Sequence, residues 1–202
     1  MWLGGGLSEE EPRGSGTALA GAVMDRSESG TVRQGDWFVL TSPAWEPNES
    51  EQSPPPRTIV GRWKIGADGQ VGPFEPNPAY LPPDEQSPTD PLDALLHLIH
   101  AGDADAGAEL VPTLRQSVVE IGCDEHGRPV IDKAPDDVPC VLVVTAHAQK
   151  FGPPVQRWLR LVGDELPAVI PPGVDILLNA NGRAAFRLRA EALHRDGSAT
   201  RD

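Results

Sequence analysis

Histidine and cysteine side chains are the first candidates for chemistry in this chain, which contains 5 histidines and 2 cysteines. His97 and His100 are three residues apart, so a helix would present both on one side. A metal site needs further ligands from other elements, and neither a Cys-x-x-Cys nor a His-Glu-x-x-His motif accompanies this pair. We therefore expect the chain to bind no metal and no other cofactor.

Cys123 and Cys140 each lie in an apolar, strand-like run. Neither follows a helix start or a cationic neighbour that would lower the pKa of its thiol. The sequence predicts two buried free thiols in a reducing compartment. The alternative is a disulfide between neighbouring strands.

Acidic pairs and one further histidine complete the catalytic candidates. Asp124-Glu125 and Asp136-Asp137 lie in turn-like segments, whereas catalytic carboxylate pairs need contrasted environments that separate their pKa values. His147 follows an apolar strand but has no identifiable partner, and Ser117 belongs to no Gly-x-Ser-x-Gly motif. We expect no catalytic residues and no enzyme; an enzyme built on His147 and loop carboxylates is the alternative.

The charge balance excludes several classes of partner. The chain has 17 Lys and Arg residues against 30 Asp and Glu residues, with a net charge of −13. Nucleic acids and anionic membranes attract basic surfaces, so neither is an expected partner. No apolar run approaches the roughly 18 residues of a membrane span. The N-terminus lacks the pattern of a secretory signal, which predicts a cytoplasmic protein.

Composition divides the chain into five parts. We expect a disordered N-terminal extension (1–34), a small aromatic-rich β subdomain (35–80), a Pro-rich linker (81–89), an α+β domain (90–193) and a polar tail (194–202). Met24 lies close to the point where patterned sequence begins, so translation from Met24 is an alternative to Met1.

The β subdomain contains three expected strands, residues 36–41, 58–65 and 70–74. So small a unit cannot bury its aromatic residues by itself, and we expect it to pack on the main domain. A cleft between the two units, lined by Trp37, Trp45 and Trp63, would suit a small ligand. A ligand-binding sensor or regulatory module is therefore the second functional hypothesis.

The main domain opens with the clearest helix signal. Asp90 is a good N-cap, Pro91 suits the first helical position, and Gly102 ends the helix. A second helix is expected at 104–116, bent or interrupted at Pro112. Residues 118–123 and 128–132 should form a hairpin, and the apolar run 140–145 predicts a central strand buried on both faces.

The last third is partly ambiguous. Residues 155–162 fit either a helix or a strand, and 164–170 predicts a short helix capped by Asp164. Residues 174–178 and 184–189 predict a hairpin in which Asn181 and Gly182 supply positive φ angles. The fold class is α+β: a mixed β-sheet packed by a few helices, with a small N-terminal antiparallel subdomain.

Three arginines share one parity on the last expected strand: Arg183, Arg187 and Arg189. On a strand their side chains would point to one face, and those of Phe186 and Leu188 to the other. A solvated strand face explains this pattern. The alternative is a docking strip for an acidic partner or for a second copy of the chain, with Trp63 as a fourth contact residue.

The order of motifs over 90–190 resembles the SseB-like N-terminal domain family. The matching stretches are 90–96, 124–130, 138–144 and 170–183, and the chain departs from the family's Leu-Asn-Pro-Gly turn at 178–182. With 61–69 and 74–80 added, residues 35–190 resemble actinobacterial type VII secretion system-associated proteins. The resemblance implies a non-enzymatic accessory protein whose partner is a type VII secretion component or substrate. It also favours a strand followed by a short helix at 155–170.

Overall fold

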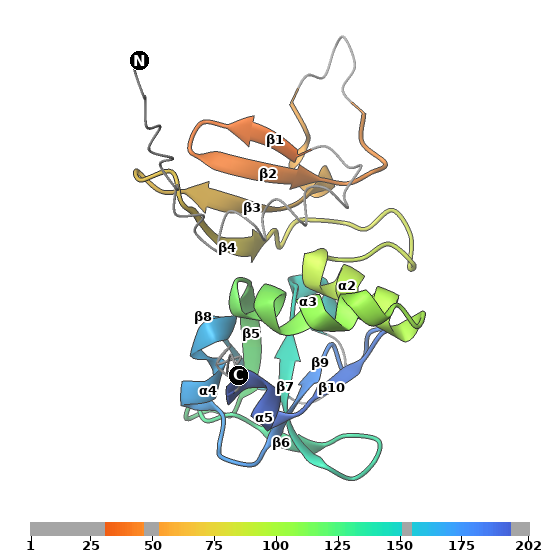
Figure 1. Ribbon diagram of the computed structural model, residues 1–202, viewed down its shortest axis with the longest axis vertical. Helices are drawn as coiled ribbons and strands as arrows, with labels where there is room; N and C mark the ends of the chain where they lie inside the picture. The colour runs from red at the N-terminus through yellow and green to blue at the C-terminus, as the bar shows by residue number, and fades with distance from the viewer. Residues whose placement is uncertain (1–30, 47–52, 151–154, 195–202) are drawn as a thin grey trace, which may run out of the picture.

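A computed structural model describes residues 31–46, 53–150 and 155–194 of the chain. The fold is α+β, as predicted: a four-stranded antiparallel sheet of N-terminal residues and a six-stranded mixed sheet (Figure 1). Helices α2 and α3 lie between the two sheets. The expectations for residues 1–30 and for the tail from 195 fall outside the described residues.

The N-terminal sheet has the strand order β1-β2-β3-β4. Its strands are β1 (Thr31–Gln34), β2 (Trp37–Thr41), β3 (Ile59–Ile65) and β4 (Val71–Pro76), with a 3-10 turn η1 (Pro56–Thr58) before β3. The extension expected to run to residue 34 therefore ends earlier, because residues 31–34 pair with β2. Gly35, at φ 59°, makes the tight turn between the two strands.

The N-terminal sheet has an apolar cluster of its own and also packs on the main domain, as expected. The buried members are Leu40, Val60, Trp63, Phe74 and Tyr80. The rings of Trp63 and Phe74 are 4.7 Å apart between centroids, in a tilted arrangement that aromatic pairs favour. Tyr80, which follows the last strand, folds back and closes the cluster.

The large sheet has the order β10-β9-β7-β5-β8, with β6 beside β7. Its strands are β5 (Val118–Cys123), β6 (Ile131–Lys133), β7 (Pro139–Val144), β8 (Arg157–Val162), β9 (Asp175–Leu178) and β10 (Phe186–Leu188). Strands β7 and β9 are parallel and the other pairs antiparallel. The predicted central strand is confirmed as β7, and 157–162 is a strand rather than a helix.

The expected hairpin between 118–123 and 128–132 forms only next to its turn. Both edges of β5 are already occupied, by β8 along its whole length and by β7 at Glu120 and Ile121. The returning chain therefore pairs only with the end of β5, through the bridge between Cys123 and Pro129 and a hydrogen bond from Val130 N to the carbonyl of Gly122 (2.9 Å), and then pairs with β7 as β6.

The helices pack on one face of the large sheet. They are α2 (Pro91–His100), α3 (Ala104–Arg115), α4 (Leu166–Val169) and α5 (Ala190–His194), with 3-10 turns η2 (His147–Gln149) and η3 (Gly163–Glu165). Leu92, Leu96, Leu110 and Leu114 join the main core with β-strand side chains. In the described ranges, no helix is long and apolar enough to cross a bilayer.

Three local predictions need correction. Helix α3 is continuous through Pro112. Asp164 does not cap a helix; it lies in η3, exposed, 3.8 Å from Arg115 Nε. In the β9–β10 turn the positive φ belongs to Asn179 (47°) and not to Asn181 or Gly182, because Asn179 leaves the strand with its side chain turned into the core.

A main-chain connection joins the two units. The N–H of Phe74 in β4 donates to the carbonyl of Gln116, 2.8 Å away, just before β5. The side chains of Glu75 and Arg160 approach to 3.6 Å beside this contact. Since α3 ends at Arg115, this joint holds the N-terminal sheet against the end of that helix.

Gly163 tests how tightly η3 packs on α3. A Cβ there would lie 1.9 Å from the carbonyl oxygen of Leu114, whereas a Cβ at Gly107 in α3 would meet no atom within 4 Å. We expect Gly163→Ala to lower the free energy of unfolding by about 3 kcal/mol, because main chain must move. Gly107→Ala should raise it by about 0.5–1 kcal/mol. Urea denaturation of both variants checks this; equal effects would contradict the packing described.

Candidate functional site

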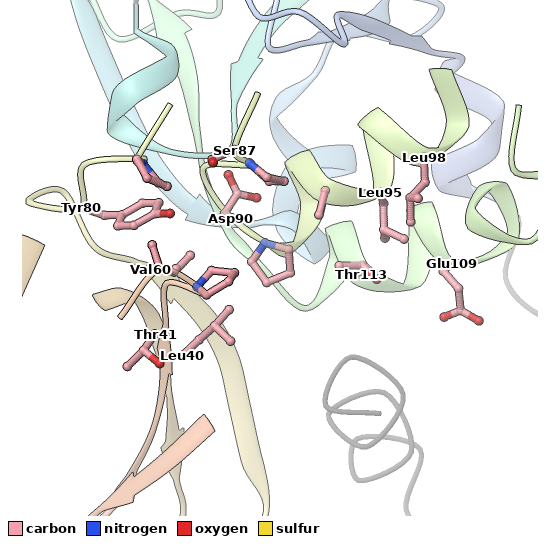
Figure 2. A pocket seen from close by; sticks show the side chains of 16 residues that line it. Leu40, Thr41, Val60, Tyr80, Ser87, Asp90, Leu95, Leu98, Glu109 and Thr113 are labelled. Carbon is pink, nitrogen blue, oxygen red and sulfur yellow. The ribbon is translucent and has the colours of Figure 1, made fainter. Parts of the chain in front are cut away.

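An apolar groove with a volume of about 600 Å³ lies between the N-terminal sheet and helices α2 and α3 (Figure 2). The sheet side contributes Leu40, Thr41, Val60 and Tyr80, and the helix side Pro91, Ala94, Leu95, Leu98, Glu109 and Thr113. The linker adds Pro83, Ser87 and Pro88. A cleft between the two units was predicted; this groove has no tryptophan in its lining, whereas Trp37 lines a separate pocket beside Arg160.

One polar group in the groove lacks a partner. Thr113 is 8% exposed, and its hydroxyl forms no hydrogen bond with any described residue. Burying a hydroxyl without a partner costs about 1–3 kcal/mol. Its oxygen is buried beneath the groove surface, so this cost is borne by the folded protein itself.

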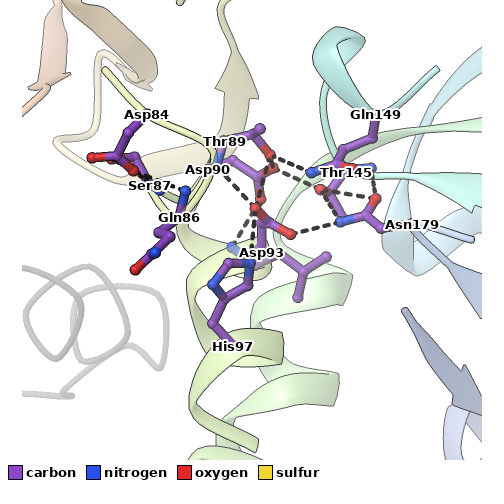
Figure 3. A network of polar contacts seen from close by, with 11 residues as sticks. Asp84, Gln86, Ser87, Thr89, Asp90, Asp93, His97, Thr145, Gln149 and Asn179 are labelled. Carbon is purple, nitrogen blue, oxygen red and sulfur yellow. Dashed lines mark hydrogen bonds and ion pairs between the residues drawn. The ribbon is translucent and has the colours of Figure 1, made fainter. Parts of the chain in front are cut away.

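A buried polar network lies at the N-terminal end of α2, where Asp90 also lines the groove (Figure 3). Asp90 Oδ1 accepts from the main-chain N–H of Leu92 (2.9 Å) and of Asp93 (3.0 Å), which is the predicted N-cap. Its Oδ2 accepts from the hydroxyls of Thr145 (2.6 Å) and Thr89 (2.9 Å). The cap residue of α2 is thereby bonded to the end of β7.

Asp93 and Asn179 form the second half of this network. Asn179 Nδ2 donates to Asp93 Oδ1 and to the hydroxyl of Thr145, both at 3.0 Å. Asn179 Oδ1 accepts from the main-chain N–H of Thr145, also at 3.0 Å. Asp93 Oδ2 accepts from Thr89 N at 3.0 Å and lies 3.8 Å from His97 Nε2. The end of β9 is thus bonded to the first turn of α2.

Burial governs the protonation of Asp90. Loss of solvation, followed by the nearby charge of Asp93, raises the pKa of this carboxyl to about 6. Hydrogen bonds from Thr145, Asp93 N and Thr89 oppose the shift. Asp90 therefore changes charge between mildly acidic and neutral pH.

The network was missed from the sequence except for the N-cap. One signal was present: Asp93 lies between Leu92 and Leu96 on the apolar side of α2, where a carboxylate needs a buried partner. No sequence feature pairs it with Asn179, 86 positions away.

The other chemical candidates remain apart. His147 is exposed, and His97 contacts Asp93 whereas His100 is exposed. Asp124, Asp136 and Asp137 form ion pairs with arginine or lysine. Across the part of the chain that the structure describes, no group of three or more His, Cys, Asp or Glu residues is placed to hold a metal ion.

Cys123 and Cys140 are free and buried, as predicted. Burial raises the pKa of both thiols, and each belongs to a different apolar cluster. A thiol with a raised pKa is a poor nucleophile at neutral pH, so the two cysteines serve as packing residues.

The arginine strip does not form the expected strand face. Strand β10 covers only residues 186–188, so Arg183 and Arg189 lie outside it. Arg187 is paired with Asp175 (2.6 Å) and Asp136 (2.7 Å), which holds its side chain against the sheet. Arg183 lies 3.8 Å from Glu85 of the linker.

The tryptophans are also placed differently from the expectation. Trp63 is 7% exposed inside the N-terminal cluster, so it offers no surface for a partner. Trp37 stacks under Arg62, whose guanidinium carbon is 4.0 Å from the ring centroid. Trp45 is half-buried.

Comparison of the chain with protein-family models, curated proteins and solved structures finds no match.

Asn179 tests the link between β9 and α2. Asn179→Ala should lower the free energy of unfolding by about 3 kcal/mol or more, because it leaves Asp93 and Thr145 with unmade buried hydrogen bonds. Asn179→Gly loses the same bonds but accepts the positive φ, so it should be about 1 kcal/mol more stable than the alanine variant. Chemical denaturation measures both; wild-type stability in either variant would contradict the role of this side chain.

Asp90 makes stability depend on pH. Its pKa is about 6 when folded, against 3.8 as the ordinary value, so the folded state binds the proton more tightly. This difference in pKa contributes on the order of 2–3 kcal/mol to the free energy of unfolding. The contribution is complete below about pH 4 and is lost as pH rises through about 6. Asp90→Asn keeps a helix cap and removes the titration.

The difference in unfolding free energy, wild type minus Asp90→Asn, should therefore fall between about pH 4 and 7 and stay constant above. Urea titrations at several pH values measure this difference. Because other groups are shared by both proteins, their titrations cancel. Parallel curves over this range would exclude a raised pKa for Asp90.

Proposed function

We propose that this protein is a non-enzymatic accessory protein of type VII secretion that binds a segment of a protein partner in the groove between the two units. The observation that carries the binding activity is the groove itself, which has apolar walls from the N-terminal sheet on one side and from helices α2 and α3 on the other. The link to type VII secretion rests on the resemblance over residues 35–190. The partner is a secretion component or a secreted substrate.

A peptide segment suits the groove better than a purely aliphatic ligand. Its apolar side chains would cover Leu95 and Leu98, the latter 40% exposed. Its main-chain groups would meet the polar residues of the lining, such as Ser87 and Glu109. Recognition of a short apolar segment by pockets and main-chain bonds is a common mode of peptide binding.

Charge favours a segment with a basic residue beside its apolar part. Glu109 lies in the groove wall and the whole chain has a net charge of −13. Complementary charge speeds association and discriminates against acidic competitors. The two free buried cysteines are consistent with work in a reducing compartment, and we place the protein in the cytoplasm.

A small-ligand sensor is the second candidate function. The groove volume of about 600 Å³ falls in the range of small-molecule sites, which is the observation that favours it. The arginine strip gives a weaker site for a protein partner or a second copy, since Arg187 is already paired with two carboxylates.

Photo-cross-linking in native cells tests the partner. A benzophenone amino acid replaces Ala94 in the groove, and Leu98→Asp adds a carboxylate to the apolar wall. The matched control is Ile131→Asp on β6, because Ile131 is 50% exposed and Leu98 40%. We expect capture of a type VII secretion protein that falls at least about tenfold with Leu98→Asp, since desolvating a carboxylate weakens binding by more than 1.4 kcal/mol.

Mass spectrometry of the captured band identifies the partner, and Ile131→Asp should leave its yield unchanged. A captured small molecule in place of a protein would favour the sensor. Capture of no secretion protein, or equal loss with Ile131→Asp, would contradict the proposed function.

A further inference from the structure

Strand β8 is an open edge of the large sheet. Within the part of the chain that the structure describes, β8 pairs with β5 and with no other strand (Figure 1). Its side chains are exposed over residues 157–160, except for the half-buried Trp158, and Leu159 is 44% exposed. An edge strand that is open to solvent can pair with an extended segment of another chain.

The register shows which main-chain groups of β8 are directed to the open edge. Gly163 N donates to the carbonyl of Ser117 over 2.8 Å, and the antiparallel register continues from there without a shift. Because hydrogen-bonded residues alternate along antiparallel strands, residues 161, 159 and 157 turn their N–H and C=O groups toward β5. Trp158 and Arg160 therefore turn theirs outward.

A side chain closes this edge at one end. Glu165 Oε2 accepts a hydrogen bond from the N–H of Val162 over 2.9 Å, which agrees with a register that turns this N–H outward. The bond occupies the edge donor that follows Arg160. The open part of the edge is therefore residues 157–160, with the outward N–H and C=O groups of Trp158 and Arg160.

The open part of the edge is basic, although the chain has a net charge of −13. Arg157 is exposed and forms no ion pair with any described residue. Arg160 lies 3.6 Å from the carboxylate of Glu75, but Arg62 shares that carboxylate at 3.5 Å. Since one carboxylate cannot neutralise two guanidiniums, a positive charge remains beside β8. The edge therefore favours an acidic segment.

A second copy of the chain fits this edge less well. Pairing of two β8 strands would bring Arg157 and Arg160 of both copies into one short ribbon, and each copy has a net charge of −13. Charged residues on edge strands commonly prevent such pairing between copies. The same arginines attract an acidic strand, because carboxylates opposite them form cross-strand ion pairs.

We propose that β8 binds an extended acidic segment of a protein partner, which adds to the large sheet as a further strand. The segment places acidic side chains opposite Arg157 and Arg160 and an apolar side chain opposite Leu159. Its main chain bonds the outward N–H and C=O groups of β8. No residue of β8 lines the groove, so this site is separate from the one in the proposed function and does not depend on it.

Synthetic peptides test this edge on the full chain. The peptide Thr-Val-Glu-Leu-Thr-Glu-Thr sets its glutamates opposite the arginines in antiparallel pairing, and a control peptide has lysine in place of both glutamates. In anisotropy titrations up to about 1 mM at low salt, the glutamate peptide should bind at least about tenfold more tightly. Amide hydrogen exchange at Trp158 and Arg160 should slow about tenfold or more in the complex, and that at Leu161 should not change, because it already bonds β5.

Variants of Arg160 separate main-chain pairing from charge. Arg160→Pro removes an outward N–H and leaves the pairing with β5 intact, so it should fold and weaken the glutamate peptide at least about tenfold. Arg160→Ala keeps the N–H and loses only the charge, so it should weaken binding less than the proline does. Independently of these, Arg157→Glu with Arg160→Glu should reverse the preference between the two peptides, because the edge becomes acidic.

Binding of neither peptide, equal binding of both, or an unchanged preference in the double variant would overturn the proposal. Exchange at Trp158 and Arg160 that slows with protein concentration in the absence of peptide would also overturn it, by assigning the edge to a second copy. Leu98→Asp in the groove should leave peptide binding at β8 unchanged. Failure of peptide binding therefore leaves the groove proposal standing, and failure of capture at Ala94 leaves this one standing.

Discussion

Two buried carboxylates at the start of α2 must find hydrogen-bond partners, and they find them at the ends of β7 and β9. The hydroxyl of Thr145 donates to Asp90 over 2.6 Å, and the amide of Asn179 donates to Asp93 over 3.0 Å. Removing one partner from such a network costs more free energy than its hydrogen bonds contribute, because the remaining charged group stays buried without a partner. The network therefore sets where α2 begins and how it lies on the large sheet. The network therefore also positions the α2 residues that line the groove.

The groove is the main consequence. Its helix wall is placed by the network, whereas its sheet wall is placed by the main-chain joint between Phe74 and Gln116. Two separate attachments thus define one apolar surface, which neither unit forms alone. Asp90 belongs to both the network and the groove wall. An occupant of the groove would therefore lie next to the carboxyl whose pKa is raised.

Local features were predictable because they depend on neighbours in the sequence. The cap at Asp90, the apolar run that became β7 and the buried cysteines all follow from residue type and spacing. The failures involve distant residues. The spacing of the arginines suggested an unpaired basic strip. In the structure, the guanidinium of Arg187 forms ion pairs with the carboxylates of Asp175 and Asp136. Likewise the hairpin expected after β5 is cut short, because β7 and β8 occupy the two edges of β5 and the returning chain pairs with β7 instead.

The sequence by itself determined the α+β class, the start of α2 and the acidic net charge. These follow from composition and from interactions over a few residues. Only the tertiary structure decided that Trp63 is core, that Asn179 takes the positive φ, and that Thr113 faces a groove without a partner. Those outcomes depend on which distant side chains fill the space and satisfy the hydrogen bonds around each residue. The spacing of residues along the chain does not specify which distant side chains make these contacts.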